Sequence, residues 1–145
     1  MKIFNLKKDK LSSKSIIHNN QNLEAILNAL IPKVLYNNAS GSNGNINLSE
    51  TVNNFSKIEI SFRPNDGTDY TNTVIVYNPN GKYVPLSYML VNSSGNAIYN
   101  KAKMIYINGT SISNWGSRYC EIWNGNGCSV EKQNYIYITK VVGYK

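Results

Sequence analysis

The sequence lacks the features that mark several large classes of protein. No run approaches the ~20 consecutive apolar residues of a membrane-spanning helix, so we expect no membrane insertion. Residues 1–10 lack the apolar stretch of a secretion signal, which predicts synthesis in the cytoplasm and release by another route, such as cell lysis. With one histidine, His18, and two cysteines, Cys120 and Cys128, the chain has no recognisable zinc site, and we expect no metal or other cofactor.

Acidic residues are also scarce, and none of the eight stands in a pattern typical of an enzyme. The glycine-rich residues 41–45 lack the Lys-Ser/Thr ending of a phosphate-binding loop and predict a turn. A glycosidase with two carboxylates could be built on Glu121 and Glu131, but it would need one acid of raised pKa in a cleft. We therefore expect a protein that is not an enzyme and has no catalytic residues.

The positive charge is concentrated in the first residues of the chain. The net charge is +7, and the residues before position 15 carry +4 of it. This leader has no arginine and only Phe4 as an aromatic residue, so it is typical of a solvated or docking segment rather than of an arm that binds nucleic acid. We expect it to contact another protein and no nucleic acid.

Asparagine and tyrosine are abundant, with 24 and 11 residues. Asparagine tolerates left-handed turn conformations and tyrosine combines an apolar ring with a polar tip, so both suit a β-protein with many turns. Both are also common on adaptable binding surfaces. The codon bias of an AT-rich genome would give the same excess, and composition alone leaves these explanations open.

One segment, residues 20–31, has the pattern of an amphipathic helix. Its apolar residues fall on a single stripe, namely Leu23, Ile26, Leu27, Leu30 and Ile31. Asn19 or Asn20 can cap its start, and Pro32 ends it. Three turns are not stable alone, so the stripe packs either on the rest of the chain or on copies of itself. Residues 1–32 are thus predicted to be a basic leader with a short helix for anchoring or oligomerisation.

From residue 33 onward, short apolar runs alternate with turn signals, as in an all-β sandwich or barrel. Ile58, Ile60 and Phe62 alternate with polar residues, which predicts a strand with one solvated face. The expected strands are residues 34–37, 45–48, 57–62, 72–77, 83–91, 97–107, 117–123 and 135–142. The predicted fold of residues 33–145 is an antiparallel, jelly-roll-like β-sandwich, preceded by the short helix.

The closing segment, residues 136–145, reads as a strand that ties the end of the chain into a sheet. Simple alternation puts Ile136, Ile138 and Val142 on one face and Val141 on the other.

Cys120 and Cys128 flank a segment with two Asn-Gly pairs, which predicts a β-hairpin. That geometry permits a disulfide without requiring one. In a reducing cytoplasm the thiols would stay reduced, so oxidation would follow release from the cell. The sequence leaves the pairing of the two cysteines open.

A series of short motifs in residues 33–145 resembles a known family. The motifs are VLYNNASG at 34–41, INLSE at 46–50, FSKIEI at 55–60, VYNPNGK at 76–82, INGT at 107–110 and IYITKVVGYK at 136–145. In this order and spacing they resemble the C-terminal β-domain of tail-fibre and receptor-binding proteins from phages and prophages of Gram-positive bacteria.

The resemblance implies a virion protein that forms a homotrimer and attaches to carbohydrate on the host cell wall. The chain departs from the family in its N-terminal segment, where a basic leader and one helix replace a long shaft. We expect this segment to anchor the chain to another virion protein. The alternatives are a head-fibre or baseplate decoration that meets no receptor, and an enzyme that degrades surface polysaccharide, which would depend on Glu121 or Glu131.

Saccharide binding needs flat aromatic faces for the sugar ring and polar groups for its hydroxyls. The densest cluster of both kinds is residues 114–124, and its candidate ligand-binding residues are Trp115, Arg118, Tyr119 and Trp123. Alternation places Tyr119, Glu121 and Trp123 on one face, opposite Arg118, Cys120 and Ile122. A second candidate pair is Tyr83 and Tyr88, around Pro85, which suggests an edge strand or a bulge. Both clusters have the alternative role of packing in the core or between subunits.

Overall fold

The structure is a computed structural model, which describes residues 13–65, 70–91, 94–123 and 126–145. The chain divides into two compact units, Met1–Ile31 and Pro32–Lys145, and each is described by itself. The elements of the second unit are β1 (Lys33–Ser42), β2 (Ile46–Asn47), the short 3-10 helix η1 (Val52–Asn54), β3 (Lys57–Pro64), β4 (Asn72–Tyr77), β5 (Lys82–Val91), β6 (Ala97–Asn108), β7 (Ser111–Trp123), β8 (Asn126–Glu131) and β9 (Ile136–Tyr144).

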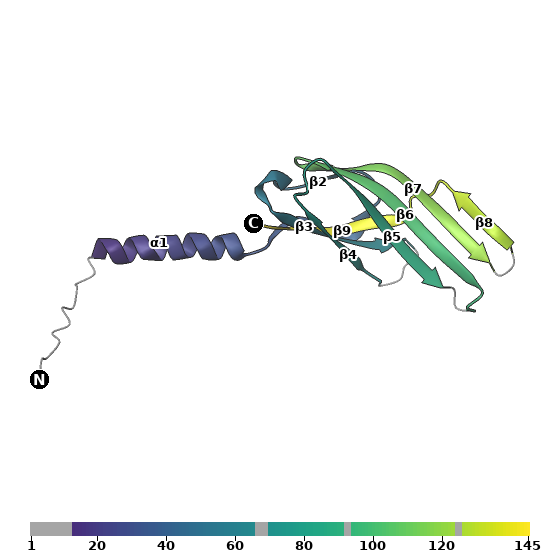
Figure 1. The fold of residues 1–145 in the computed structure, drawn as a ribbon, viewed down its shortest axis with the longest axis horizontal. Coiled ribbons are helices and arrows are strands. Elements are labelled where there is room, and N and C mark those ends of the chain that lie inside the picture. Colours follow the sequence, from purple (N-terminus) through teal and green to yellow (C-terminus); the bar gives the residue numbers. More distant parts are fainter. Residues whose placement is uncertain (1–12, 66–69, 92–93, 124–125) are drawn as a thin grey trace, which may run out of the picture. The chain divides into compact units, whose positions relative to one another are not determined.

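The described part of the first unit contains one helix, α1 (Ser13–Leu30) (Figure 1). The helix ends before Pro32, as predicted, but it begins seven residues before the predicted start. Asn19 and Asn20 lie inside it and are not its caps. The stripe side chains Leu23, Ile26, Leu27 and Leu30 are each more than half exposed in the single chain. The described residues contain no helix with the length and hydropathy of a membrane span.

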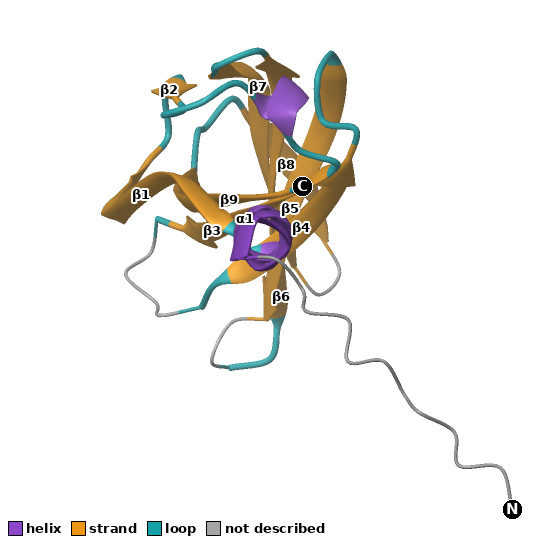
Figure 2. Ribbon diagram, turned by 90° about the vertical axis from the view of Figure 1, so that its left-hand side faces the viewer, coloured by secondary structure: helices purple, strands orange, loops and turns teal. Residues whose placement is uncertain are grey.

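The second unit is a sandwich of two antiparallel sheets, which confirms the predicted all-β fold. The first sheet has the strand order β1-β9-β3-β4, and Figure 2 shows β1, β9 and β3 side by side. The second sheet has the order β2-β7-β6-β5, with β8 paired to β7. Pro85 lies in β5, so the predicted edge strand is confirmed.

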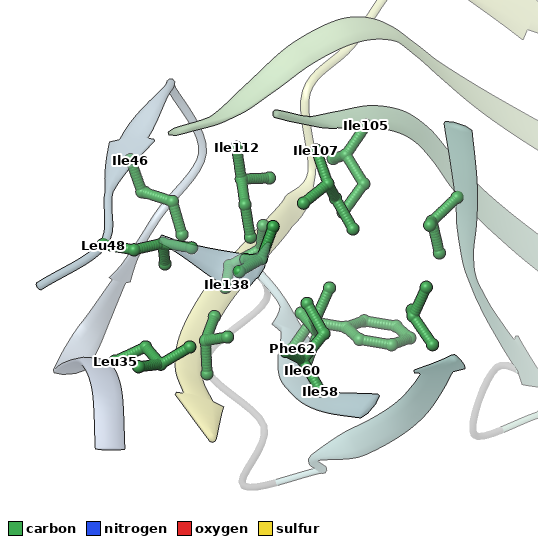
Figure 3. Close-up of a cluster of buried hydrophobic side chains, with 14 of the residues drawn as sticks. Leu35, Ile46, Leu48, Ile58, Ile60, Phe62, Ile105, Ile107, Ile112 and Ile138 are labelled. Atoms are coloured by element: carbon green, nitrogen blue, oxygen red, sulfur yellow. The ribbon is translucent and has the colours of Figure 1, made fainter. Parts of the chain in front are cut away.

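The core lies between the two sheets and is almost wholly aliphatic. Ile58, Ile60 and Phe62 of β3 point into it, as their alternation predicted. Ile105 and Ile107 of β6 meet them from the second sheet (Figure 3). Ile58, Ile60, Ile105 and Ile107 have no exposed surface. Burying a side chain of this size contributes roughly 1.5–3 kcal/mol, so these four isoleucines contribute substantially to the stability of the sandwich.

The closing strand β9 lies between β1 and β3 and ties the end of the chain into the first sheet, as predicted. Its predicted alternation is wrong after Ile138. On the β3 side, Phe62 pairs with Ile138 but Ser61 pairs with Lys140, so Thr139 is the extra residue of a β-bulge.

The bulge shifts the core side of β9 by one residue. Val141 is fully buried, and Val142 is only half-buried. Gly143 also falls on the core side, where a Cβ atom would lie 2.5 Å from the Phe55 ring. Only glycine fits there without moving Phe55.

Two strands of the second sheet differ from the prediction. β7 begins at Ser111, six residues earlier than expected, and β8 was not predicted as a strand. Pairing with β6 holds the first half of β7 in the sheet despite Asn114 and Gly116, which favour turns. The predicted hairpin between β7 and β8 is confirmed, and Cys120 is disulfide-bonded.

The second sheet extends beyond the first at one end (Figure 1). β3 ends at Pro64, opposite Ile136 at the start of β9. Lys103 of β6 is level with that end, because its Nζ donates to the carbonyl oxygen of Ile136. β6 and β7 remain paired past this level, as far as Ala97 opposite Trp123. The second sheet therefore has a covered half and an extended half.

Candidate functional site

The outward face of the second sheet carries a hollow, which we call the outer groove. It is centred on β5, β6 and β7, where Pro85, Met104 and Gly116 stand opposite one another across the three strands. The next outward row is Ser87, Ala102 and Arg118. These residues and Trp115 line a space of about 480 Å³.

A β-bulge places Trp115 at the edge of this groove. Met104 pairs with Gly116, but Ile105 pairs with Asn114, so Trp115 has no partner on β6. A bulge lets two successive residues share one face of a strand. The indole consequently stands on the outward face and is 67% exposed.

Two tyrosines on the same face support the indole. The Tyr83 ring lies edge-on to Trp115, with centroids 5.1 Å apart and planes at 75°. Tyr106 lies behind Tyr83, with centroids 4.6 Å apart. Edge-to-face contacts of this kind favour one ring orientation. Trp115 therefore has a supported edge while most of its surface stays open to a ligand.

The floor of the groove is low because its side chains are small. An added Cβ at Gly116 would have no atom within 4 Å, so this position borders open space. Ala102 contributes a single methyl group in the neighbouring strand. Between Trp115 and Arg118 there is consequently room for a flat ring.

Arg118 gives the groove its polar and charged end. The side chain is exposed, and Nη1 donates to the carbonyl oxygen of Ser117 at 2.8 Å. No carboxylate belongs to the groove lining among the described residues. Lys103 lines it from β6, but its Nζ lies on the other face of the sheet, bonded to Asn43 and Ile136. The groove thus combines an exposed indole with a guanidinium group that can serve as a hydrogen-bond donor.

The structure brings three of the six candidate residues together and separates the others. Trp115 and Arg118 line the outer groove, and Tyr83 borders it through its ring contact with Trp115. Tyr119 lies on the face opposite Arg118, as alternation predicted; this is the inward face, where Tyr88 is buried. The side chain of Trp123 lies outside the described residues.

The hydroxyl of Tyr119 donates to Glu121 Oε2 at 3.0 Å. Burial raises the pKa of Tyr119, and the bond to Glu121 raises it further, so this hydroxyl remains a donor. Strand pairing puts Glu131 on the same face, since it stands opposite Tyr119. Within the described part of the chain, no group of three or more histidine, cysteine or acidic side chains is placed to bind a metal ion.

Several groove residues were not identified from the sequence, namely Pro85 as a lining residue, Ala102, Met104 and Gly116. The supporting Tyr106 was not identified either. Alternation along β6 indicates which of its residues face outward, but only the register with β7 shows that Met104 meets Gly116. No signal in the sequence predicted the bulge that turns Trp115 outward. Comparison with protein-family models and with curated proteins finds no match to this chain.

Proposed function

We propose that this chain is a phage virion fibre or tip protein that binds saccharide on the host cell surface without catalysis. The motif series of residues 33–145 supports the virion role. The observation that carries the binding role is the exposed Trp115, which Tyr83 supports beside an open floor and Arg118. The apolar face of a pyranose ring would stack on the indole, and its hydroxyls would accept hydrogen bonds from Arg118.

A single site of this kind binds weakly, so the proposal includes a homotrimer. Leu23 and Leu30 of α1 are seven residues apart, with Ile26 between them, which is the spacing of a coiled-coil seam. Three linked copies engage a polymeric surface with an avidity far above the affinity of one copy. The basic residues ahead of α1 would dock on another virion protein.

The test measures binding of the fluorescently labelled full chain to intact cells of candidate Gram-positive hosts. Cell-wall polysaccharide serves as the competitor. We expect saturable binding that the polysaccharide competes away. The Trp115→Ala variant should lose binding by about tenfold or more, or about 1.4 kcal/mol, because it removes the stacking surface from every linked copy.

Tyr77→Ala is the matched control. Tyr77 is 66% exposed, close to the value for Trp115, but it lies on β4 of the other sheet. It should bind cells like the parent chain. Equal binding by the parent and Trp115→Ala, or no binding to any permissive host, would overturn the proposal.

A second candidate function is a structural decoration of the capsid or baseplate. It is favoured by exposed apolar residues on the outward face of the extended half, which are Met89, Val91, Ile98, Ile122 and Val130. Together with the exposed stripe of α1, these residues fit a protein that is covered by its neighbours. This function predicts tight binding to isolated virions that lack the protein, and no affinity for host cells.

A further inference from the structure

The charged residues of the second sheet are distributed unequally between its two faces. Strands β5, β6 and β7 contain five charged residues. Four of them alternate onto the inward face, namely Lys82, Lys101, Lys103 and Glu121. Arg118 falls on the outward face, opposite Ala102 in the outer groove. Among the described residues of these three strands, the outward face therefore carries a single charge, which is positive.

No acidic residue of the paired strands neutralises this charge from the same face. The one charged residue of β8 is Glu131, which stands opposite the inward Tyr119. The ion pairs found within the described residues do not include Arg118. In the same part of the chain, the guanidinium group donates from Nη1 to the carbonyl oxygen of Ser117. Its other N–H donors are consequently available to a ligand.

Arg118 lies close to the stacking surface of the outer groove. Gly116 and Arg118 are two residues apart on the same face of β7, a separation of roughly 6–7 Å along the strand. Trp115 flanks Gly116 on its other side. The floor here is low, since an added Cβ at Gly116 meets no atom and Ala102 has a single methyl group. A sugar ring stacked on the indole would therefore hold its substituents near the guanidinium group.

A guanidinium group in this setting favours an anion over a neutral hydroxyl. Its planar N–H groups match two oxygens of a carboxylate or phosphate and form paired, charge-assisted hydrogen bonds. The side chains of Pro85 and Met104, which line the same groove, offer it no oxygen acceptor. A neutral sugar would leave the positive charge without a counter-charge, whereas an acidic sugar would neutralise it.

We infer that the outer groove selects a sugar residue that carries an anionic group, either a carboxylate or a phosphate. The ring stacks on Trp115, and two oxygens of the anionic group accept hydrogen bonds from Arg118. This inference deepens the proposed function and rests on it for the saccharide class of the ligand. It adds that the charge of the saccharide, and not only its ring, decides binding.

The test is an NMR titration of the full chain that follows the indole signals of Trp115 and the side-chain Nε–H signal of Arg118. The three probes are D-glucuronic acid, D-glucose 6-phosphate and uncharged methyl glucoside, each up to about 20 mM, which covers a Kd on the order of 1 mM. We expect saturable shifts of both side chains with at least one acidic sugar, at a Kd about tenfold below that of methyl glucoside. The two acidic probes tell a carboxylate ligand from a phosphate ligand.

Variants separate the contribution of charge from that of stacking. Arg118→Gln should weaken binding of the acidic sugar by about tenfold and leave that of methyl glucoside unchanged. Arg118→Lys should have an intermediate effect, because it keeps the charge but loses the paired hydrogen bonds. Trp115→Ala should weaken binding of charged and uncharged sugars alike. Because Arg118 is exposed, its variants should keep the fold.

Lys140→Gln is the matched control for net charge. Lys140 is exposed on β9 of the other sheet, and its replacement lowers the net charge by the same amount as Arg118→Gln. It should titrate like the parent chain. An equal loss of acidic-sugar binding in both variants would show a general effect of net charge and would overturn the inference.

The inference is also overturned if neither acidic sugar shifts the Trp115 and Arg118 signals, or if methyl glucoside binds as tightly as the acidic sugars. Its failure is distinct from that of the proposed function. Host-cell binding that Trp115→Ala abolishes and Arg118→Gln leaves unchanged would refute charge selection and keep the adhesion role. Acidic-sugar binding that depends on Arg118, with no binding to any permissive host, would refute the adhesion role and keep the anion site.

Discussion

The two halves of strand β6 have the same neighbours, β5 and β7, but differ on the side that faces the first sheet. In the covered half, Ile105 and Ile107 have no exposed surface and pack in the aliphatic core. In the extended half, the equivalent inward positions are Lys103, Lys101 and Tyr99. The inward positions of β6 are thus apolar where the two sheets overlap, and mostly polar where the first sheet has ended.

This difference shows how one sheet can serve stability and binding. The covered half gains free energy by removing aliphatic surface from water. The extended half has no facing sheet of equal length, so its inward lysines donate to polar groups of the chain, which are Asn65 Oδ1 and the carbonyl oxygens of Asn43 and Ile136. The outward face contributes little to the core along its whole length, and it carries both the outer groove and the exposed apolar residues of the extended half.

The largest expected effect is in the covered half. Ile105→Ala should lower the free energy of unfolding by about 2–5 kcal/mol, because it leaves a cavity in a core that cannot collapse fully. Met104→Ala is its matched control, since Met104 is the preceding residue and is 36% exposed on the outward face. We expect a loss below about 1 kcal/mol there. Urea unfolding followed by circular dichroism measures both, and equal losses would contradict the distinction between the two faces.

The next largest effect is the pH dependence of the free energy of unfolding, which tests the buried Lys103 where the first sheet ends. Burial lowers the pKa of Lys103 from 10.5 to about 8. Between these values the unfolded chain binds the proton that the folded chain has lost, so the free energy of unfolding should rise as pH increases from about 8 to 10.5. Below that window both states are protonated, and the cost of burying the charge is present in full.

Lys103→Met should remove this rise and increase the free energy of unfolding at pH 7 by about 2 kcal/mol. This gain in free energy of unfolding is smaller than the pKa shift of Lys103 alone implies, because the carbonyl oxygens of Asn43 and Ile136 lose their donor. Lys140→Met is the control, since Lys140 is exposed on β9. Urea unfolding at a series of pH values measures both variants. A slope that persists in Lys103→Met would show that another group causes it.

The smallest expected effect is on the outward face, where a substitution should weaken binding without changing stability. Gly116→Val fills the floor of the outer groove, and host-cell binding should fall by about tenfold, or about 1.4 kcal/mol. The free energy of unfolding should change by less than about 0.5 kcal/mol, because an added Cβ meets no atom and valine suits a strand. Gly116→Ala should have an intermediate effect on binding.

Gly44→Val is the control for this series. An added Cβ at Gly44 meets only the Ser42 hydroxyl oxygen, at 3.9 Å, and the residue lies outside the groove. Binding to cells should remain at the parent level. Loss of binding in both glycine variants would indicate a general disturbance of the sandwich.

Much of the fold could be predicted because local patterns decide it. Ile58, Ile60 and Phe62 alternate with polar residues, and the structure buries all three. The turn signals marked most strand ends, and Pro32 marked the end of α1. The candidate site was harder to predict from the sequence than the fold. Tyr83, Trp115 and Arg118 could be selected as residue types that bind sugars, but their grouping into one groove depends on pairing between strands distant in sequence.

The sequence by itself determined the all-β class, the position of the amphipathic helix and the alternation of β3, because each depends on residues within a few positions of one another. Only the tertiary structure decided the bulges at Thr139 and Trp115, the inclusion of the first half of β7 in the second sheet and the end of the core at Lys103. A bulge shifts every later residue of its strand to the other face, and its place is set by the partner strand. The face on which Trp115 or Val141 lies is therefore a property of the paired strands rather than of either segment alone.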